Sequence, residues 1–357
     1  MNYIALKDVC TINMGQSPES SSYNEIGDGI PFFQGNADFG ERYPITRVWC
    51  NKPTKVAKAE DILISVRAPI GAMNYAKEKC CIGRGVAALT PNEEKVSSEF
   101  IFWLLKGKNN ELNQKGTGST FKAIGRKVLE EIQVPEINLE LQRKYASNLE
   151  RIYSIIQDRQ KQLEQLDKLV RARFVEMFGD PKINPNHYLM SQLSKYITFL
   201  TSGSRGWAKY CTDDGSEWFI TIKNVKDCHI LVDNMQPVNA PDNAEAKRTK
   251  VQKGDLLISI TADLGRTGVV TEEIAEHGAY INQHLTCIRL NQTVLNPLYV
   301  SYFMESPAGK EQFESKNQSA VKAGLNFNSI NSLLIMVPPI ELQNQFADFV
   351  QAIDKSK

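Results

Sequence analysis

The sequence has no closely spaced cysteine pair, no long apolar run and no excess of basic charge. Its seven cysteines form no CxxC motif and its four histidines stand apart from them, so the pattern does not predict a structural zinc site. An odd number of scattered cysteines is typical of proteins from a reducing compartment. We therefore expect a cytoplasmic protein without a bound metal ion.

Long hydrophobic segments are also missing. No apolar run approaches the roughly 18 residues that a membrane-spanning helix needs, and the N-terminal MNYIALKDVC has no signal-peptide core. With 42% hydrophobic and 23% charged residues, the composition is that of a globular protein outside the membrane. Its 357 residues exceed the usual size of a single compact core, so we expect two domains.

The net charge is only +1, from 42 basic and 41 acidic residues. Proteins that bind nucleic acid without selectivity usually carry a strong basic excess, and this chain does not. Its basic charge is instead local, in a segment at 106–127 that contains one acid and the small-residue loop KGTGSTFK. Free backbone N–H groups in such a loop suit phosphate binding, although a solvated basic face explains the segment equally well. The basic residues are Lys106, Lys108, Lys115, Lys122, Arg126 and Lys127.

The chain contains an internal repeat. DILISVRAPIG at 61–71 returns as DLLISITADLG at 255–265, with Asp, Leu, Ile, Ser, Ala and Gly retained. Four further segments recur in the same order, which indicates a real duplication. They are LKDVCTINMGQS and LSKYITFLTSGS, IPFFQGNADF and EWFITIKNVKD, GSTFKAIG and QSAVKAGL, and IQVPEINLELQRKY and IMVPPIELQNQF. In this alignment Asn36 matches Asn224.

Each repeat consists of short strand-like segments followed by an amphipathic helix, near SSEFIFWLLKG and NPLYVSYFMES. This pattern predicts a small β-rich α+β domain. The strand at 61–67 is apolar on both faces until its end, so its interior is predicted to be buried. Asp61 and Asp255, at the strand starts, are interpreted as structural. The two copies differ at the strand tip, where Arg67 corresponds to Thr261.

A long helix is predicted between the repeats. Apolar residues recur at alternating steps of four and three over 138–180, as in a coiled coil, and Gly179 and Pro181 then end the helix. About 40 residues at roughly 1.5 Å each make a rod of about 60 Å. A shorter helix with the same spacing follows the second repeat. The predicted packing residues are Tyr145, Leu149, Ile152, Ile156, Leu163, Leu166, Val170, Phe346, Val350 and Ile353.

The second helix stops at Lys357, before one further heptad. Half of the seam on the first helix therefore has no partner within this sequence. We expect either a shortened C-terminus or another chain that covers the remaining surface.

Two β-rich repeats, each ending in VP and a Leu-Gln-rich helix (VPEINLELQ, VPPIELQ), with EMFGDP closing the central helix, resemble the specificity subunit of type I restriction–modification systems. The resemblance implies two target recognition domains joined by a long antiparallel coiled-coil-type spacer. It assigns 1–137 and 181–338 to these domains, 138–180 to the central spacer helix and 339–357 to the short C-terminal spacer helix. Each domain then reads half of a bipartite target in double-stranded DNA.

The resemblance also implies that the chain is not an enzyme and carries no cofactor. Modification (methyltransferase) subunits would use S-adenosylmethionine, and restriction/translocase subunits would use ATP and Mg. The spacer helices would dock these partner subunits. Half-sites one or more turns of DNA apart, about 34–36 Å each, suit readers held by a rod.

Arg or Lys on guanine and Asn or Gln on adenine are the usual base contacts in the major groove. The DNA-binding candidates are Gln16, Gln34, Asn36, Arg67, Arg84, Lys115, Thr117, Ser119, Lys122, Arg205, Lys223, Asn224, Thr261, Gln283, Lys316, Gln318 and Lys322. Each one alone is better explained as an exposed polar loop residue, but their clustering at corresponding positions of both repeats favours the set. Gln283 and the adjacent His284 are equally explained as structural hydrogen-bonding residues. Arg67, at the variable tip, is the strongest candidate.

Two other functions stay open: a self-contained adenine DNA methyltransferase, and a coiled-coil scaffold without DNA recognition. NPLY at 296–299 resembles a methyltransferase base-binding motif. It aligns, however, with SSEF at 97–100, so Asn296 is predicted to cap a helix and Pro297 to lie in the first turn. No GxxxxGK[ST] sequence is present, so KGTGSTFK is not an ATP-binding loop.

Overall fold

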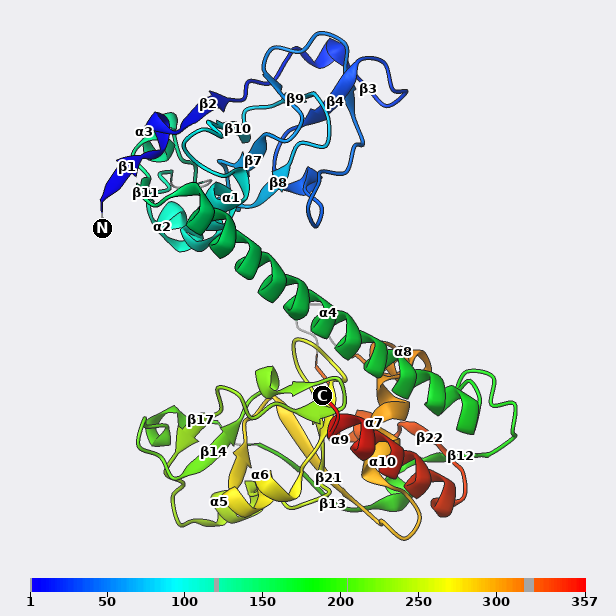
Figure 1. The fold of residues 1–357 in the computed structure, drawn as a ribbon. Coiled ribbons are helices and arrows are strands. Elements are labelled where there is room, and N and C mark those ends of the chain that lie inside the picture. The colour runs from blue at the N-terminus through cyan, green and yellow to red at the C-terminus, as the bar shows by residue number, and fades with distance from the viewer. Residues whose placement is uncertain (1, 119–121, 204, 318–323) are drawn as a thin grey trace. The chain divides into compact units, whose positions relative to one another are not determined.

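The computed structural model describes residues 2–118, 122–203, 205–317 and 324–357. The chain divides into two compact units, Met1–Arg159 (unit 1) and Gln160–Lys357 (unit 2), shown in Figure 1. The 40-residue helix α4, Leu139–Phe178, contributes its first half to unit 1 and its second half to unit 2.

Unit 1 is built on a four-stranded antiparallel sheet in the order β2-β10-β7-β8. A second sheet has the order β3-β5-β4-β9-β6, with β4 and β9 parallel, and β1 pairs with β11. The strands are β1 Tyr3–Ala5, β2 Cys10–Met14, β3 Tyr23–Asn24, β4 Ile30–Phe33, β5 Trp49–Cys50, β6 Val56–Ala57, β7 Ile62–Ser65, β8 Met73–Tyr75, β9 Cys80–Ile82, β10 Val86–Pro91 and β11 Gln133–Pro135. Besides α4, the α-helices are α1 Ser98–Gly107, α2 Asn109–Gln114 and α3 Arg126–Glu130.

Strand β7 is buried on both faces, as its sequence predicts. Ile62 and Ile64 pack in one core cluster with Ile101 of α1, whereas Leu63 packs on the opposite face with Val86. Burying an aliphatic side chain of this size contributes about 1.5–3 kcal/mol, so this strand is firmly anchored. The loop that follows β7 therefore leaves the sheet at a fixed point.

Unit 2 repeats this plan with the sheet β13-β21-β18-β19, the pairs β12-β22 and β15-β16, and a sheet β17-β14-β20 in which β14 and β20 run parallel. The strands are β12 Leu189–Gln192, β13 Ile197–Ser202, β14 Glu217–Ile220, β15 Val225–Lys226, β16 His229–Ile230, β17 Gln236–Val238, β18 Leu256–Ser259, β19 Thr267–Val269, β20 Ala279–Ile281, β21 Leu285–Leu290 and β22 Leu334–Val337. The helices are α5 Ala244–Thr249, α6 Glu272–His277, α7 Pro297–Glu305, α8 Pro307–Ser315, α9 Phe327–Asn331 and α10 Ile340–Asp354.

The duplication is visible in individual hydrogen bonds. After β7, the N–H of Val66 donates to the carbonyl of Gly85 at 2.9 Å, and after β18 the N–H of Ile260 donates to the carbonyl of His284 at 2.9 Å. The predicted α+β fold class with two related β-rich repeats is confirmed. The structure also shows that Asp61 and Asp255 are structural: Asp61 accepts from Thr90 Oγ1 at 2.7 Å, and both carboxylate oxygens of Asp255 accept from Arg289 at 2.8 Å.

One predicted correspondence between the repeats is wrong. Asn224 ends the 3₁₀ turn Ile222–Asn224, and its Oδ1 accepts from the N–H of Thr221 at 2.9 Å. In unit 1 the equivalent bond is made by Asp38, whose Oδ2 accepts from the N–H of Gln34 at 2.7 Å, and not by Asn36. The turn of unit 1 begins one residue later after its strand, which shifts the alignment.

The second half of α4 packs antiparallel against α10. Lys357 Nζ lies 2.8 Å from Asp167 Oδ1, while Phe346, earlier in α10, packs edge-on against Phe174, later in α4, with ring centroids 5.3 Å apart. Of the predicted packing residues, Val170, Phe346 and Val350 are buried, Leu163, Leu166 and Ile353 are half-buried, and Tyr145, Leu149, Ile152 and Ile156 are exposed.

The coiled-coil pattern missed two aromatic residues of this packing, Phe174 and Phe178. Both are buried, and both contact Tyr299 of α7, at centroid distances of 5.6 and 4.7 Å. An alternating step of four and three assumes one partner helix. Here α4 packs against α7 as well as α10, so successive steps of four from Val170 face the core.

Candidate nucleic-acid interface

Loops that follow different strands of unit 1 lie together. The N–H of Gln16, after β2, donates to the carbonyl of Ile82 in β9 at 3.0 Å. The N–H of Arg84, in the turn between β9 and β10, donates to Ser17 Oγ at 3.3 Å. The loop after β2 therefore rests on the β9–β10 turn, and the side chains of Gln16 and Arg84 are both exposed there.

Gly85 allows the loop after β4 to join this group. A Cβ atom at this position would lie 2.2 Å from the carbonyl oxygen of Gln34, which no other residue type could tolerate. Gln34 is also exposed. Thus Gln16, Gln34 and Arg84 are brought together, although they are far apart in the sequence.

The loop after β7 places Arg67 beside the same turn. The preceding Val66 donates to Gly85, and the following Ala68 donates its N–H to the carbonyl of Lys122 at 3.0 Å. Ser65 Oγ donates to the carbonyl of Arg67 at 2.8 Å, which fixes the backbone while the Arg67 side chain is exposed. A fixed backbone with an exposed guanidinium is the arrangement that base or phosphate contacts need.

The segment after α2 completes the group. Thr117 and Ala123 exchange backbone hydrogen bonds of 3.0 and 2.9 Å, and Arg67 forms a β-bridge with the same Ala123. Lys115, Thr117 and Lys122 are exposed. The candidate Ser119 lies outside the described residues. We call the exposed residues of these loops the unit 1 tip: Gln16, Gln34, Arg67, Arg84, Lys115, Thr117 and Lys122.

An ion pair holds one lysine of the tip. Glu111 of α2 accepts hydrogen bonds from Lys108 at 2.8 Å and from Lys115 at 2.6 Å. These two bonds lower the pKa of Glu111 to about 2. The carboxylate therefore stays ionised and competes with any phosphate for Lys115.

Only part of the basic segment at 106–127 belongs to the tip. Lys106 lies over the ring of Tyr153, with Nζ 3.6 Å from the ring centroid. Arg126 and Lys127 pair with acids one turn later, at and just after the end of α3. The segment therefore contains two features. One is a set of helix residues that contact neighbouring side chains, and the other is the pair of tip lysines, Lys115 and Lys122.

Unit 2 builds the same tip with different side chains. Thr261 occupies the position of Arg67, and Gln283 and His284 occupy those of Arg84 and Gly85. Thr261 Oγ1 lies 2.6 Å from His284 Nδ1, and Gln283 Nε2 lies 3.1 Å from His284 Nε2. Arg67 and Arg84 of unit 1 are thus replaced by a threonine and a glutamine, each hydrogen-bonded to His284.

Other candidates of unit 2 occupy related places. Lys316 caps the C-terminus of α8 as Lys115 caps that of α2. Arg205, shortly after β13, and Lys223, in the turn Ile222–Asn224, are exposed. The candidates Gln318 and Lys322 lie outside the described residues.

The prediction that Asn224 contacts DNA disagrees with its place in the structure. Its side chain is 6% exposed, its Oδ1 accepts from Thr221, and its Nδ2 donates to the carbonyl of Leu231 at 3.3 Å. The amide groups are thus engaged within the fold and cannot reach a base. Asn36 is half-buried within the turn Asn36–Asp38, and its predicted role stays a prediction.

The NPLY segment is a helix start, as predicted. Asn296 Oδ1 accepts from the N–H of Leu298 at 2.9 Å, and Pro297 is the first residue of α7. In unit 1, Ser97 caps α1 by accepting from Phe100. Within the described residues, no group of three or more His, Cys, Asp or Glu side chains is arranged to hold a metal ion.

The two loop clusters share one backbone framework and carry different side chains. The family model of the type I restriction modification DNA specificity domain matches residues 1–166 and 236–357. The chain belongs to this specificity-domain family.

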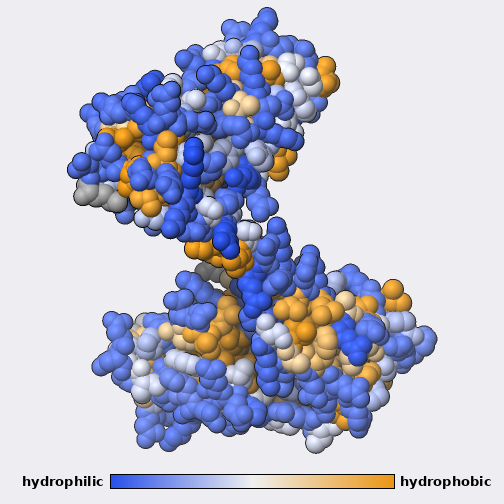
Figure 2. Space-filling model, in the orientation of Figure 1, coloured by the Kyte–Doolittle hydropathy of each residue, from blue (hydrophilic) through white to orange (hydrophobic). Residues whose placement is uncertain are grey.

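Figure 2 shows a surface that is mostly hydrophilic with hydrophobic patches on both units. No helix of the described ranges is long and apolar enough to cross a membrane.

Relatives of the specificity domain are similar to parts or all of this chain. A Methanocaldococcus jannaschii protein, assigned as the type I restriction enzyme MjaX specificity subunit, is 48% identical over 157 residues, 44% of this chain. That match spans 37% of the relative, less than half of its length. The type I restriction enzyme EcoBI specificity subunit of Escherichia coli is 19% identical over 98% of this chain and 78% of its own.

A solved structure shares the fold. The type I restriction–modification S subunit from M. genitalium superposes with a TM-score of 0.60 over 99% of this chain and 89% of its own, at 14% identity. At this identity the likeness concerns the fold alone. It agrees with the two β-rich repeats and the long helix described above.

Proposed function

We propose that the chain is the sequence-specific DNA recognition subunit of a type I restriction–modification complex, in which each repeat reads one half of a bipartite target. The observation that carries the proposal is the paired tips. The framework bonds of Val66 and Ile260 are the same, whereas the side chains that follow differ: Arg67 is exposed and Thr261 is half-buried. Different side chains on one framework are what two different half-sites require.

The chemistry of the tips suits base reading in the major groove. An arginine can donate two hydrogen bonds to guanine, and a glutamine can bind adenine through both amide groups. In unit 1, Arg67, Arg84 and two glutamines supply these groups. In unit 2, Gln283 and the Thr261–His284 pair supply them, so the second half-site would differ in base composition.

The remaining assignments follow from family membership and are part of the proposal. The chain itself would be non-catalytic and would act in the cytoplasm. Methylation with S-adenosylmethionine, and translocation and cleavage with ATP and Mg, would belong to partner subunits. The capping role of Asn296 supports recognition over a self-contained methyltransferase, since it leaves NPLY no base-binding role.

Exposed apolar residues on α4 support the docking of a partner. Leu149, Ile152 and Ile156 are 42%, 54% and 53% exposed, which is unusual for aliphatic side chains in succession along one helix. Beside them, an apolar groove of unit 1 is lined by Phe100, Trp103, Leu104, Pro135, Tyr145, Asn148 and Leu149. Covering this surface would remove apolar area from water at about 25 cal/mol per Å².

Sequencing of methylated bases in cells that carry the complete system tests the proposal. We expect one bipartite motif with a gap of fixed length, which disappears when this chain is deleted. An undivided short motif, or no methylation that depends on this chain, would overturn it. Calorimetry of the purified chain with S-adenosylmethionine separates the alternatives, because tight binding would indicate a methyltransferase. Absence of sequence-dependent DNA binding with the modification subunit would indicate a scaffold.

A further inference from the structure

A short hairpin of unit 2 reaches the spacer helices. β15 and β16 are joined by Asp227 and Cys228, whose φ angles are +49° and +67°. A two-residue turn with both residues left-handed is normally Asn-Gly or Asp-Gly, because a Cβ atom disfavours this conformation. A turn held in a disfavoured conformation needs contacts that fix it.

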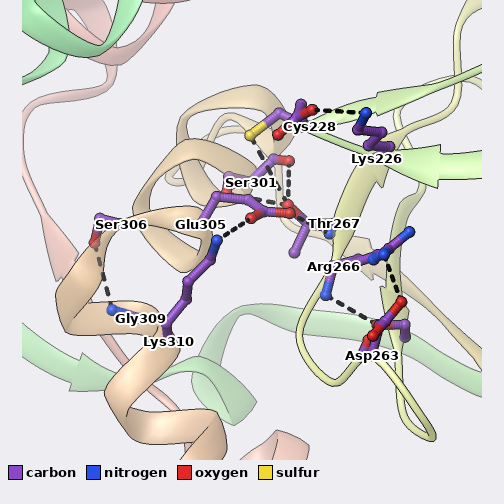
Figure 3. Close-up of polar contacts among 12 residues, drawn as sticks. Lys226, Cys228, Asp263, Arg266, Thr267, Ser301, Glu305, Ser306, Gly309 and Lys310 are labelled. Atoms are coloured by element: carbon purple, nitrogen blue, oxygen red, sulfur yellow. Dashed lines mark hydrogen bonds and ion pairs between the residues drawn. The ribbon is translucent and has the colours of Figure 1, made fainter. Parts of the chain in front are cut away.

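Buried contacts fix one side of the turn. Cys228 is 3% exposed, and its Sγ lies 4.0 Å from Thr267 Oγ1 (Figure 3). Thr267 Oγ1 lies 2.7 Å from Ser301 Oγ, and the N–H of Thr267 donates to Glu305 at 2.8 Å. Glu305 also accepts from Lys310 at 3.2 Å. The hairpin is thereby tied to α7 and α8.

His229 fixes the other side, on α10. Its Nε2 lies 2.8 Å from Asp354 Oδ2, and its Nδ1 lies 2.6 Å from the backbone carbonyl of Asp227. Both partners are acceptors, so both ring nitrogens must carry a proton for both bonds to exist. The geometry therefore requires the imidazolium form of His229.

Charged groups surround this bond from every neighbouring element. Lys357 Nζ lies 2.9 Å from Asp354 and 2.8 Å from Asp167 of α4. Arg171 of α4 lies 3.5 Å from Asp227. The described titratable and charged groups near His229 are Asp167, Arg171, Lys226, Asp227, Cys228, Lys253, Glu272, Tyr302, Asp354 and Lys357.

Unit 1 has a corresponding contact in which an arginine takes the place of the histidine. The loop between Phe39 and Pro44, which form a β-bridge, occupies the place of the β15–β16 hairpin. Its Arg42 Nη1 lies 2.5 Å from Glu150 Oε1 on α4, and the guanidinium lies 5.2 Å from the ring centroid of Tyr75. An arginine stays charged at any pH that a protein experiences.

We propose that His229 is a positioning residue: in its protonated form it holds the second recognition domain in register with α10. Arg42 holds the first recognition domain on α4 through Glu150, without proton dependence. The inference rests on the proposed function, because register with the spacer sets which gap between half-sites is accepted. Loss of the His229–Asp354 bond would loosen the gap requirement rather than the choice of bases.

The pH range of this effect follows from two pKa shifts. The hydrogen bond to Asp354 raises the pKa of His229 above its ordinary value, against the opposing effect of burial. Burial opposes ionisation of Asp354, but hydrogen bonds from His229 and Lys357 outweigh it and lower the pKa of this carboxyl. Because the pKa of His229 is raised, its bond contributes full stability below the ordinary histidine value of about 6.5, and this stability is lost as the pH rises through the shifted pKa. Because the pKa of Asp354 is lowered, its bond contributes full stability above the ordinary value of about 3.9, and this stability is lost as the pH falls through the shifted pKa. The bond is therefore intact in mildly acidic solution.

The decisive experiment measures methylation by the complete complex on DNA with the cognate gap and with the gap changed by one base pair. At pH 6.5 we expect the wild type to prefer the cognate gap, and at pH 8.5 we expect this preference to fall about three- to tenfold. H229Q should show the weak preference at both pH values. H277Q, which changes a histidine stacked on Trp218 outside the hairpin, should match the wild type. E150Q should weaken the preference equally at both pH values, because Arg42 does not titrate.

A second measurement begins with the wild-type chain alone. The chain has four histidines, so imidazole NMR signals can be followed individually in a pH titration. We expect His229 to titrate above the ordinary range and D354N to return it there. An ordinary titration in the wild type, or full gap preference in H229Q at both pH values, overturns the inference. Absence of sequence-dependent methylation by the wild-type complex at every pH would instead contradict the proposed function.

Discussion

Gln142 and Gln343 make the same three hydrogen bonds at corresponding positions of the two repeats. Gln142 Oε1 accepts from the N–H of Ser97 at 2.9 Å, and its Nε2 donates to the carbonyls of Ile137 and Lys95 at 2.8 and 3.2 Å. Gln343 repeats these bonds with Asn296, Pro338 and Val294, at 2.9, 2.8 and 3.0 Å. Both side chains are buried, at 1% and 0% exposure. Each amide thus joins the first turn of a spacer helix to the start of a domain helix.

Replacing either glutamine with leucine should destabilise its own unit. Q142L removes three hydrogen bonds, one buried and two part-buried, and we expect a loss of about 2–4 kcal/mol in the stability of unit 1. Hydrogen exchange followed by mass spectrometry should show faster exchange in α1 and β11 with Q142L, and in α7 and β22 with Q343L. Q133L, at an exposed glutamine of unit 1, is the matched control and should change stability by less than about 0.5 kcal/mol. Equal effects of Q142L and Q133L would contradict this account.

Arg67→Ala should relax selectivity at one half-site only. If the guanidinium binds guanine through two hydrogen bonds, the loss is about 1–3 kcal/mol against the cognate base and little against other bases. Binding of the assembled complex to DNA with each base in turn at every target position measures this. Lys95→Ala is the control, because Lys95 follows the opposite end of β10 from the tip. Uniform weakening toward every sequence would mark Arg67 as a phosphate contact.

Transfer of unit 1 tip residues to unit 2 should need two changes together. In T261R alone, the new side chain meets His284, which occupies the place of Gly85. We expect T261R to lower modification of the second half-site without changing its sequence. The double variant T261R/H284G should alter the bases read in that half-site, while the first half stays the same. Methylation sequencing distinguishes the outcomes, and H284G alone controls for loss of the histidine.

Removal of Glu111 should strengthen binding to DNA of any sequence. E111Q frees Lys115 from its 2.6 Å ion pair, and we expect a roughly two- to fivefold higher affinity at low salt. One additional phosphate contact would steepen the dependence of log K on log salt by about 0.9. E131Q is the matched control for E111Q, because Glu131 pairs with Lys127 outside the tip. The prediction fails if E111Q and E131Q give the same salt dependence.

The repeat, the strands and the long helix were predictable because they follow from hydrophobic patterns that burial imposes directly. The register of strand pairing, which decides how the two repeats align residue by residue, was not predictable. The VP motifs suggested an alignment of Val134 with Val337, whereas the strand pairing matches Val134 with Ile335. Proline at these positions ends a strand but does not define where the pairing begins, and only the complete hydrogen-bond pattern does so.

The tips were predictable in part. Arg67 and Thr261 stood out because one motif was copied and changed, and the structure places both where loops meet. Asn224 was misjudged because an amide that caps a turn and an amide that reads a base look the same in a sequence. The capping glutamines were missed for the same reason: their role depends on burial, and Gln142 lies among exposed neighbours along α4.

The buried cluster of Thr267, Ser301 and Glu305 also has an evolutionary consequence. Counted from the residues that cap α1 and α7, Ser301 corresponds to Phe102 and Glu305 to Lys106. Phe102 stacks on Tyr75 at 4.7 Å, and Lys106 lies over Phe102 and its aromatic neighbours. Neither arrangement tolerates a single member of the other: a lone serine at 102 would leave a void beside Tyr75, and a lone phenylalanine at 301 would remove the hydroxyl that bonds Thr267 Oγ1. At these positions the two copies differ by matched sets of side chains, so a change in one member of a set favours a compensating change in the others.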